Sequence, residues 1–424
     1  MHVLSSTDST EQSKYQNQGQ LQDPTNPTGA VDSNGYHIHI ASRINSSHPN
    51  IIANRAAQLR AQGIALTSLN DSNPTHHGLA PCVLPEQYSA NPRGSLTSRK
   101  LLAQVLADEQ HRDIDPEHLM ILDSTSQAYS WAITALCDPG DAVLSPAPGY
   151  PLIDSICALQ AVHNIQYRLC YDGSWYVDIA ALHQLCQEHP HIRALIVVNP
   201  NNPTGSYIHQ SDRQALLDLC RQYQLALIAD EVFFDFTLQP LASARRFAGE
   251  QSVVTLAFDG LSKRLAAPHA KVGWIELSGP EDQVRRVQTM LDAVADDYLP
   301  FSVLTERALP QLLDELSSQQ KKVHQRITHN LELLHAALAH SDTAVVSLLR
   351  AEAGWNVLLQ FPSSIDENEL ALRMLEQEHM LIQPGYFFDM TSNGFVAVSL
   401  LPEPDQFVHG IDCLLRTIDD MLNA

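Results

Sequence analysis

Residues 194–205 read ALIVVNPNNPTG, an apolar run that ends in a turn rich in asparagine and proline. Two further apolar runs end in polar residues in the same way: residues 225–233 read LALIADEVF, and residues 253–263 read VVTLAFDGLSK. Short apolar runs separated by helical stretches are typical of buried parallel strands, whose carboxyl ends meet at one edge of a sheet. We therefore expect the polar residues after these three strands to face a common cleft.

Lys263 closes the third of these runs. A lysine amine attacks an aldehyde only when it is partly deprotonated, and a strand end that opens into a cleft supplies this by desolvation or through a neighbouring cation. An isolated lysine is more often a solvated charge. Lys263 gains significance because Asp230 and the Asn-Pro-Asn-Asn-Pro-Thr-Gly turn stand at matching strand ends.

The same alternation extends toward the N-terminus and predicts an α/β fold. Apolar spacing predicts a helix over 98–108, capped by Ser95 or Thr97, and later a strand, a hydroxyl-rich turn and a buried helix over 119–136. A strand at 142–145 and a helix at 153–159 follow. We predict a large domain of three α/β/α layers around a mostly parallel sheet.

The pattern changes after Trp274, where long amphipathic stretches cover 280–294 and 312–339. They lead to a smaller α+β domain with strands expected near 344–348, 354–359 and 395–400 and a final helix over 404–422. The predicted units are a polar, mobile extension (1–47), a large α/β domain (48–300) and a bridging helix with the small domain (301–424).

The composition and charge of the chain argue against several classes of function. The chain has 424 residues and a formal charge of -22 with only 26 Lys and Arg, which argues against nucleic-acid binding. It has no apolar run long enough to cross a membrane and no leader pattern, so we expect a cytoplasmic protein. The seven scattered cysteines are interpreted as reduced thiols, and no histidine pair has zinc-ligand spacing, so no metal is predicted.

The turn before the helix at 128–136 contains Ser124, Thr125 and Ser126. Free amides and hydroxyls at the start of a helix bind anions, although a simple helix cap explains the same residues. From about residue 60 to the end, the chain resembles class I/II aminotransferases, the aspartate aminotransferase-like enzymes of fold type I that depend on pyridoxal phosphate.

The resemblance implies a role for each matching residue. Lys263 is expected to form the internal aldimine with the cofactor and to move the proton between the substrate Cα and the cofactor. Asp230 is expected to keep the pyridine nitrogen protonated, Asn202 to donate to the phenolic oxygen, and Tyr150 to stack on the ring.

The resemblance also implies a phosphate site and a dimer. Ser124, Thr125, Ser126, Ser262 and Lys271 are expected to bind the phosphate, and Tyr88 matches the position that reaches it from a second subunit. The expected assembly is a homodimer with shared active sites, which binds a small-molecule amino donor and a keto acceptor.

Four positions depart from the family pattern. Phe233 replaces a tyrosine beside the phenolic oxygen, Lys271 replaces an arginine, and Gly260 replaces a serine. Ala397 stands where the family places the arginine that binds the substrate carboxylate, a bidentate contact worth roughly 1.5–3 kcal/mol. Possible substitutes are three cations (Arg264, Arg93, Lys271) and the neutral donors Asn202 and Asn356.

The predicted function is transamination between an amino acid and a 2-oxo acid, with an atypical substrate. The alternative is a lyase, cyclase or decarboxylase that uses the same cofactor, which Phe233 and the missing arginine favour. A non-enzymatic regulator is a third interpretation, but the N-terminal segment has neither helix-turn-helix periodicity nor a basic stripe.

Overall fold

The three apolar runs form adjacent parallel strands, as their pattern predicts. The computed structural model describes residues 35–42, 58–63, 90–299, 302–341 and 344–423. Strands β5 (Ile192–Val198), β6 (Ala226–Asp230) and β7 (Thr255–Gly260) lie side by side, with Val198 opposite Asp230 and Asp230 opposite Phe258. Their carboxyl ends therefore meet at one edge, where Lys263 follows β7 in the short helix α7 (Leu261–Arg264).

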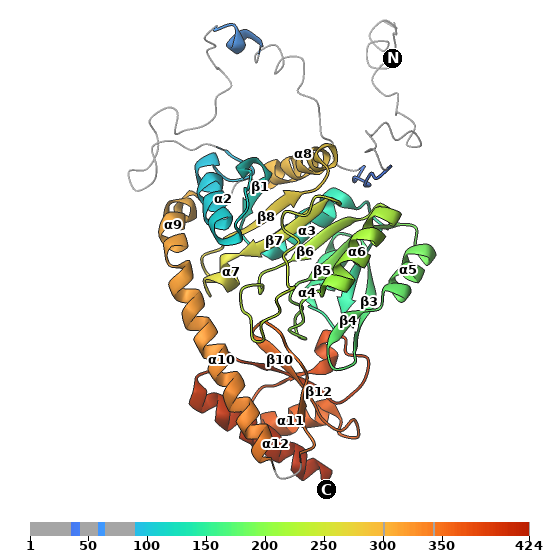
Figure 1. The fold of residues 1–424 in the computed structure, drawn as a ribbon, viewed down its shortest axis with the longest axis vertical. Coiled ribbons are helices and arrows are strands. Elements are labelled where there is room, and N and C mark those ends of the chain that lie inside the picture. Colours follow the sequence, from blue (N-terminus) through green and yellow to red (C-terminus); the bar gives the residue numbers. More distant parts are fainter. Residues whose placement is uncertain (1–34, 43–57, 64–89, 300–301, 342–343, 424) are drawn as a thin grey trace, which may run out of the picture. The chain divides into compact units, whose positions relative to one another are not determined.

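These strands are the centre of an eight-stranded sheet with the order β1-β8-β7-β6-β5-β2-β3-β4 (Figure 1). Strands β2, β3, β5, β6 and β7 are parallel, whereas β8, β1 and β4 join antiparallel. The other strands are β1 (Leu119–Leu122), β2 (Ala142–Ala147), β3 (His163–Tyr171), β4 (Trp175–Val177) and β8 (Gly273–Ser278). The mostly parallel sheet confirms the predicted α/β class.

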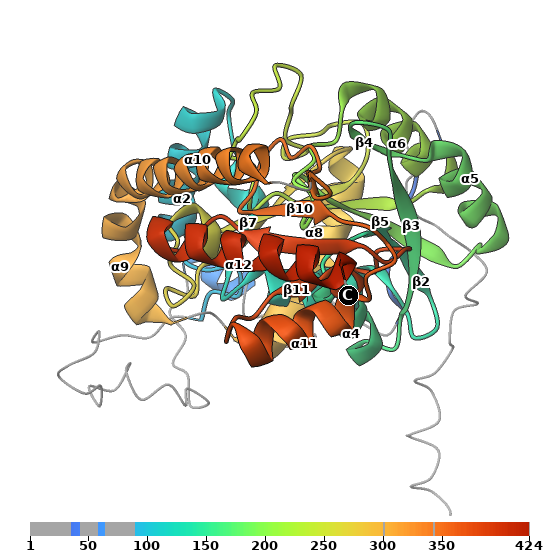
Figure 2. The same ribbon diagram turned by 90° about the horizontal axis from the view of Figure 1, so that it is seen from below.

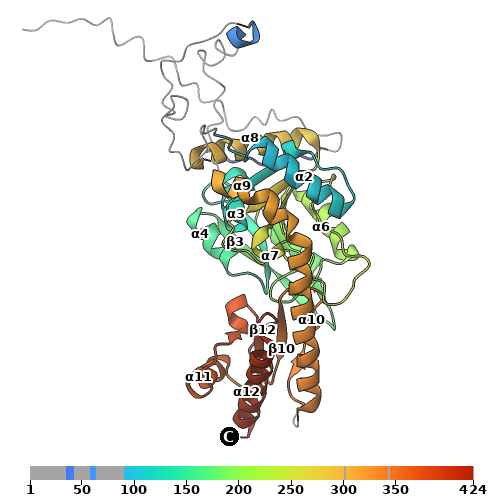
Figure 3. The ribbon, with the colours of Figure 1, turned by 90° about the vertical axis from the view of Figure 1, so that its left-hand side faces the viewer.

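Helices cover both faces of this sheet and complete the three layers. In Figure 3, α3 (Thr125–Leu136) and α4 (Leu152–Leu159) lie on one side and α6 (Gln210–Tyr223) on the other. The remaining helical elements of the large sheet are α2 (Leu96–Gln110), η2 (Pro116–His118), α5 (Ile179–Glu188) and α8 (Glu281–Tyr298). Ser95 caps α2 by accepting a hydrogen bond from the Ser98 amide, as the sequence predicts.

The C-terminal part forms a second, antiparallel sheet with the order β11-β12-β10-β9. Its strands are β9 (Ser347–Leu348), β10 (Asn356–Gln360), β11 (Gln383–Pro384) and β12 (Phe395–Ser399), with η3 (Gly385–Phe388) beside them. Figure 2 shows α11 (Glu367–Gln377) and α12 (Pro404–Leu422) packed side by side on this sheet. Their apolar faces share one core with β10 and β12, which includes Val357, Val396 and Leu414.

One helical stretch and several strands differ from the sequence-based expectations. The single stretch expected over 312–339 consists of two helices, α9 (Val303–Asp314) and α10 (Leu316–His340), which meet at Glu315. Strands β3, β4, β8 and β11 were not predicted. Strand β3 has one buried residue, Tyr167, among exposed and half-buried ones, and β8 contains the buried charge of Glu276, which pairs with Arg112 at 2.6 Å. Neither strand therefore presents a continuous apolar run.

Cys157, Cys170, Cys186, Cys220 and Cys413 are free thiols, and Cys82 lies outside the described residues. Among the helices in the described part of the chain, none combines the length and the apolar composition needed to span a bilayer.

Candidate active site

The strand ends and the start of α3 enclose a pocket that contains most of the residues singled out in the sequence. Its lining includes Thr125, Ser126, Tyr150, Asn202, Asp230, Phe233 and Lys263, together with Tyr129, Leu152, Val198 and Val232. Three predicted residues, Ser124, Ser262 and Lys271, do not line this pocket, and Tyr88 lies outside the described residues.

Asp230 lines the pocket and is 6% exposed. Its Oδ1 accepts a hydrogen bond from the Val232 amide (3.2 Å), and its Oδ2 accepts one from the Tyr129 hydroxyl (3.0 Å). Burial raises the pKa of Asp230 to about 6, and the two hydrogen bonds and the charge of Lys263 oppose this rise. The carboxyl group is thus held in one orientation and is ready to bind a cationic ring N–H.

Lys263 faces the same pocket, and burial lowers its pKa while the charge of Asp230 opposes this effect. Its Nζ lies 5.3 Å from the ring centre of Phe233 and 5.1 Å from that of Trp355. A lower pKa increases the fraction of neutral amine, which is the form that attacks a carbonyl carbon.

The Asn-Pro-Thr-Gly turn is held by contacts with both sheets. Gly205 has a φ of 66°, and a Cβ at this position would lie 2.6 Å from the Ala353 oxygen, so only glycine fits. The Gly205 oxygen accepts hydrogen bonds from the amides of Glu352 and Ala353, both at 2.8 Å. Asn356 Nδ2 then donates to Asn202 Oδ1 (2.9 Å), which orients the Asn202 amide so that its N–H groups remain available to the pocket.

The start of α3 approaches strand β8 closely. A Cβ on Gly273 would lie 3.1 Å from the Ser124 carbonyl carbon and 3.2 Å from the Thr125 nitrogen. Ser124 is the N-cap of α3, and its hydroxyl accepts a hydrogen bond from the Gln127 amide. Lys271 is exposed and lies just before β8. Burial raises the pKa of Asp123, and the charge of Lys271 opposes this rise.

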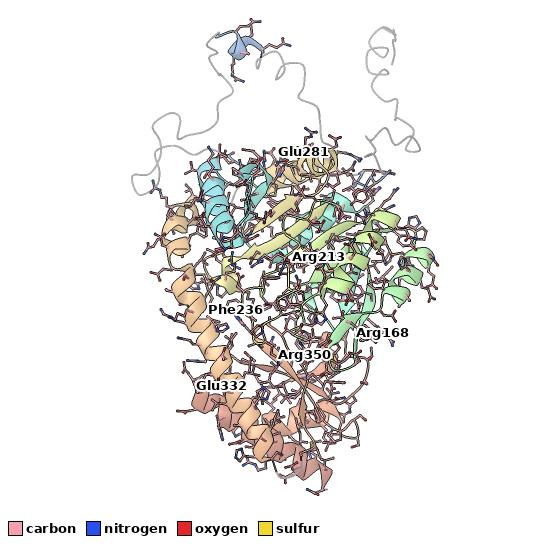
Figure 4. All side chains as sticks on the ribbon, viewed as in Figure 1. Arg168, Arg213, Phe236, Glu281, Glu332 and Arg350 are labelled. Carbon is pink, nitrogen blue, oxygen red and sulfur yellow. The ribbon has the colours of Figure 1, made fainter. Side chains whose placement is uncertain are left out.

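The structure also explains the glycine that replaces a serine at position 260. A Cβ on Gly260 would lie 2.9 Å from the Val272 oxygen and 3.0 Å from the Gly273 Cα. A larger residue would therefore push β8 away from β7. Phe233, in turn, packs edge-on against Trp355, with ring centres 5.5 Å apart. Trp355 also meets Phe236, labelled in Figure 4, at 5.1 Å.

Two of the three cations considered as substitutes for the missing arginine are engaged elsewhere. Arg264 is 3% exposed and forms ion pairs with Glu109 (2.5 Å) and Asp235 (2.9 Å). Arg93 pairs with Glu117 and Asp292, both at 3.0 Å. Ala397 is buried in an apolar cluster with Leu358 and Phe388.

One cluster of metal-binding type was not recognised in the sequence. His39, Asp138 and Asp141 place their ligand atoms within 4.8 Å of one another. Sequence spacing does not reveal such a group, because His39 and Asp138 are 99 residues apart. Arg193 already neutralises Asp141 at 3.0 Å, and burial followed by the charge of Arg193 lowers the pKa of His39. We assign no metal to this group.

Comparison with known proteins identifies the family. The sequence pattern described as aminotransferase class I and II matches residues 87–405. The chain belongs to the class I and II aminotransferases. The cofactor of this family is pyridoxal 5'-phosphate, and the protein is a pyridoxal-phosphate-dependent aminotransferase.

The relatives of this aminotransferase include enzymes of two reaction types. It is 25% identical over 378 residues to the glutamate-pyruvate aminotransferase AlaA of Escherichia coli, covering 84% of this chain and 90% of that protein. It is also 25% identical over 307 residues to the S-alkyl-thiohydroximate lyase SUR1 of Arabidopsis thaliana, covering 69% and 64%. The alanine aminotransferase structure from Pyrococcus furiosus shares the fold, with a TM-score of 0.72, 20% identity and coverage of 86% and 95%.

The pocket of this aminotransferase fits the cofactor. Lys263 offers a half-buried amine for the aldehyde, Asp230 offers a carboxyl group for the ring nitrogen, and the start of α3 offers amides for the phosphate. Tyr150 and Val232 line the same pocket and provide surfaces for a flat ring.

Tyr129 is the functional candidate that the sequence reasoning missed. It lies four residues after Thr125 on α3, and residues at this spacing share a helix face. This spacing was visible in the sequence, but nothing in the sequence indicated that the hydroxyl would meet Asp230.

Proposed function

We propose that this aminotransferase binds its cofactor covalently through Lys263 and transfers an amino group between an amino acid and a 2-oxo acid. The observation that supports this most directly is the pairing of Lys263, whose pKa is lowered by burial, with the oriented carboxyl group of Asp230 in one pocket. When bound, the cofactor supplies an electron-withdrawing ring that stabilises negative charge on the substrate Cα.

The residues of the pocket have separate roles in this proposal. Lys263 accepts the Cα proton of the donor and returns it on the way to product. Asp230 holds a proton on the ring nitrogen, with its orientation set by Tyr129 and Val232. Asn202 donates to the phenolic oxygen through the N–H group that its contact with Asn356 leaves available.

We also propose that the active form is a homodimer in which Tyr88 of one subunit reaches the phosphate of the other. Large exposed apolar residues at the end of α8 and the start of α9 support an interface there: Tyr298 is 64% exposed, Leu299 58% and Leu304 56%. Sedimentation should then give twice the chain mass of 46.9 kDa. The cytoplasmic location remains a prediction.

Reductive labelling tests the assignment of Lys263. Borohydride reduction of the cofactor-loaded protein followed by peptide mapping should place the label on Lys263, and Lys263→Ala should remove both the label and the visible absorbance. Lys100→Ala, at an exposed position on α2, is the matched control and should retain both. A label on another lysine of the wild-type protein would overturn the proposal.

The alternative is a lyase, cyclase or decarboxylase with the same cofactor. The lyase among the relatives and the absence of a hydroxyl at Phe233 favour the lyase. Single-turnover spectra separate the two reaction types, because only transamination leaves the cofactor in its amine form until a 2-oxo acid is added.

A further inference from the structure

A second cavity adjoins the cofactor pocket and has about 620 Å³ of space. The two share Tyr150, Leu152 and Asn202, so the second cavity opens directly onto the reacting centre. Large-domain residues form one wall, and small-domain residues, Asn356, Gln383, Phe387 and Phe388, form the other. This space is large enough for the part of a donor that extends beyond its amine carbon.

The described lining of this cavity is uncharged. Its polar groups are the hydroxyls of Tyr150 and Ser155 and the side-chain amides of Asn202, Asn356 and Gln383. The remaining lining residues, Pro151, Leu152, Phe387 and Phe388, are apolar or aromatic. A carboxylate placed here would find no cation among the described lining residues, so it would gain no charge-assisted hydrogen bond.

Gln383 lines the cavity and lies opposite Ala397, the position at which the related enzymes have an arginine. It pairs directly with Ala397 across β11 and β12, and directly opposed residues in antiparallel strands point to the same face. An arginine at position 397 would therefore extend from the face that carries Gln383. Arg350, labelled in Figure 4, is not part of the lining and lies 3.1 Å from Glu352.

The side-chain amides of the cavity also favour an amino donor with a neutral carboxamide over one with a carboxylate, because the two groups form different hydrogen bonds. Asn356 uses an Nδ2 hydrogen to bond Asn202, and its Oδ1 has no partner among the described residues. A carboxylate only accepts hydrogen bonds, so it cannot pair with this oxygen. A carboxamide both donates and accepts, and it can therefore satisfy the side-chain amides of Asn356 and Gln383.

We propose that the preferred amino donor is an α-amino amide, in which a neutral carboxamide replaces the free carboxylate and an apolar side chain packs against Phe387, Phe388 and Leu152. This rests on the proposed transaminase function. The donor loses its amino group and Cα hydrogen and becomes a 2-oxo amide whose new carbonyl oxygen comes from water. The amino group passes to the cofactor and then to an acceptor with an equally uncharged 2-oxo group, such as a second 2-oxo amide, so the reaction needs no external oxidant.

The test compares matched donors with the cofactor-loaded enzyme in single turnover. The pairs are L-phenylalaninamide with L-phenylalanine and L-alaninamide with L-alanine. Conversion of the cofactor to its amine form should be at least tenfold more efficient for each amide than for its acid. Efficiency that is equal or higher for the acids would overturn the proposal but leave the transaminase function intact. Failure of all four donors would contradict both.

Amides and acids also differ in the intrinsic reactivity of their amines. Measuring the amide-to-acid ratio in wild type and in a variant removes this difference, because both proteins receive the same donors. Gln383→Arg introduces a cation at an exposed lining position and should reduce the amide-to-acid ratio at least tenfold, by increasing the efficiency with the acids. Gln377→Arg adds the same charge at an exposed site on α11 outside the cavity and should leave the ratio unchanged. Equal ratios in wild type and Gln383→Arg would show that this cavity does not select the donor.

Discussion

At the scale of single residues, the chemistry of the pocket depends most on the hydrogen bond between Tyr129 and Asp230. Both side chains are buried, and their hydrogen bond of 3.0 Å links α3 to the end of β6. Burial favours the neutral form of Asp230, and the hydroxyl of Tyr129 stabilises the charged form. The charged form is the one that can hold a proton on the ring nitrogen.

Tyr129→Phe should therefore lower kcat/KM by roughly ten- to a hundredfold, since a hydrogen bond to a charged group is worth about 1.5–3 kcal/mol. The pKa of Asp230 should rise without this donor, so the acid limb of the kcat profile should move to higher pH. Tyr167→Phe is the control, because that buried hydroxyl donates to the Ile196 oxygen instead. An unchanged pH profile in Tyr129→Phe would refute a role through Asp230.

At the scale of elements, the turn at 199–205 connects the large sheet to the small domain. It follows β5 directly, and its Gly205 oxygen accepts hydrogen bonds from the segment before β10. Through Asn202 and Asn356, the same contact orients a residue of the cofactor pocket. The two sheets must therefore dock correctly before the pocket is complete.

Gly205→Ala should destabilise this docking. An alanine here would have to adopt a left-handed φ of 66°, and its Cβ would lie 2.6 Å from the Ala353 oxygen. Gly140→Ala is the matched control, because Gly140 has a φ of 90° with open space around the added atom. We expect Gly205→Ala to lower the free energy of unfolding by about 1–3 kcal/mol more than Gly140→Ala does. Equal losses in urea denaturation would show that the docking contact is unimportant.

At the scale of the whole molecule, the buried carboxyl group of Asp230 makes folding of the cofactor-free protein depend on pH. Burial raises its pKa in the folded state to about 6, above the ordinary value of 3.8. The folded state then binds the proton more tightly than the unfolded state. This contribution to stability is fully present below pH 3.8 and is lost as the pH rises through about 6.

Cofactor-free Asp230→Asn should lack this dependence. Between pH 5 and pH 8, the wild-type protein should lose about 1 kcal/mol of stability relative to the variant, measured by denaturant unfolding at both pH values. Burial also raises the pKa of Asp259, to about 7, but both proteins retain that residue, so its effect cancels. Identical pH dependence in the two proteins would contradict a raised pKa at Asp230.

The sequence alone determined the class of fold and the central strand ends. Residues 194–198, 225–229 and 253–258 are continuous apolar runs because their strands are buried on both faces, and such runs are readable without coordinates. Lys263, Asp230 and Asn202 follow these strands directly, so the topology brings them together. Strands β3 and β8 remained hidden because partial exposure and a paired buried charge interrupt their apolar pattern.

Only the tertiary structure decided which side chains support these residues and what faces the substrate. Tyr129 meets Asp230 across 101 residues of sequence, and Asn356 meets Asn202 across 154. Contacts of this kind depend on how α3 and β10 pack against the strand ends, which local sequence patterns do not encode. The absence of the arginine could be read from Ala397 in the sequence. The neutral cavity beside Asn202 could not, because residues from both domains line it.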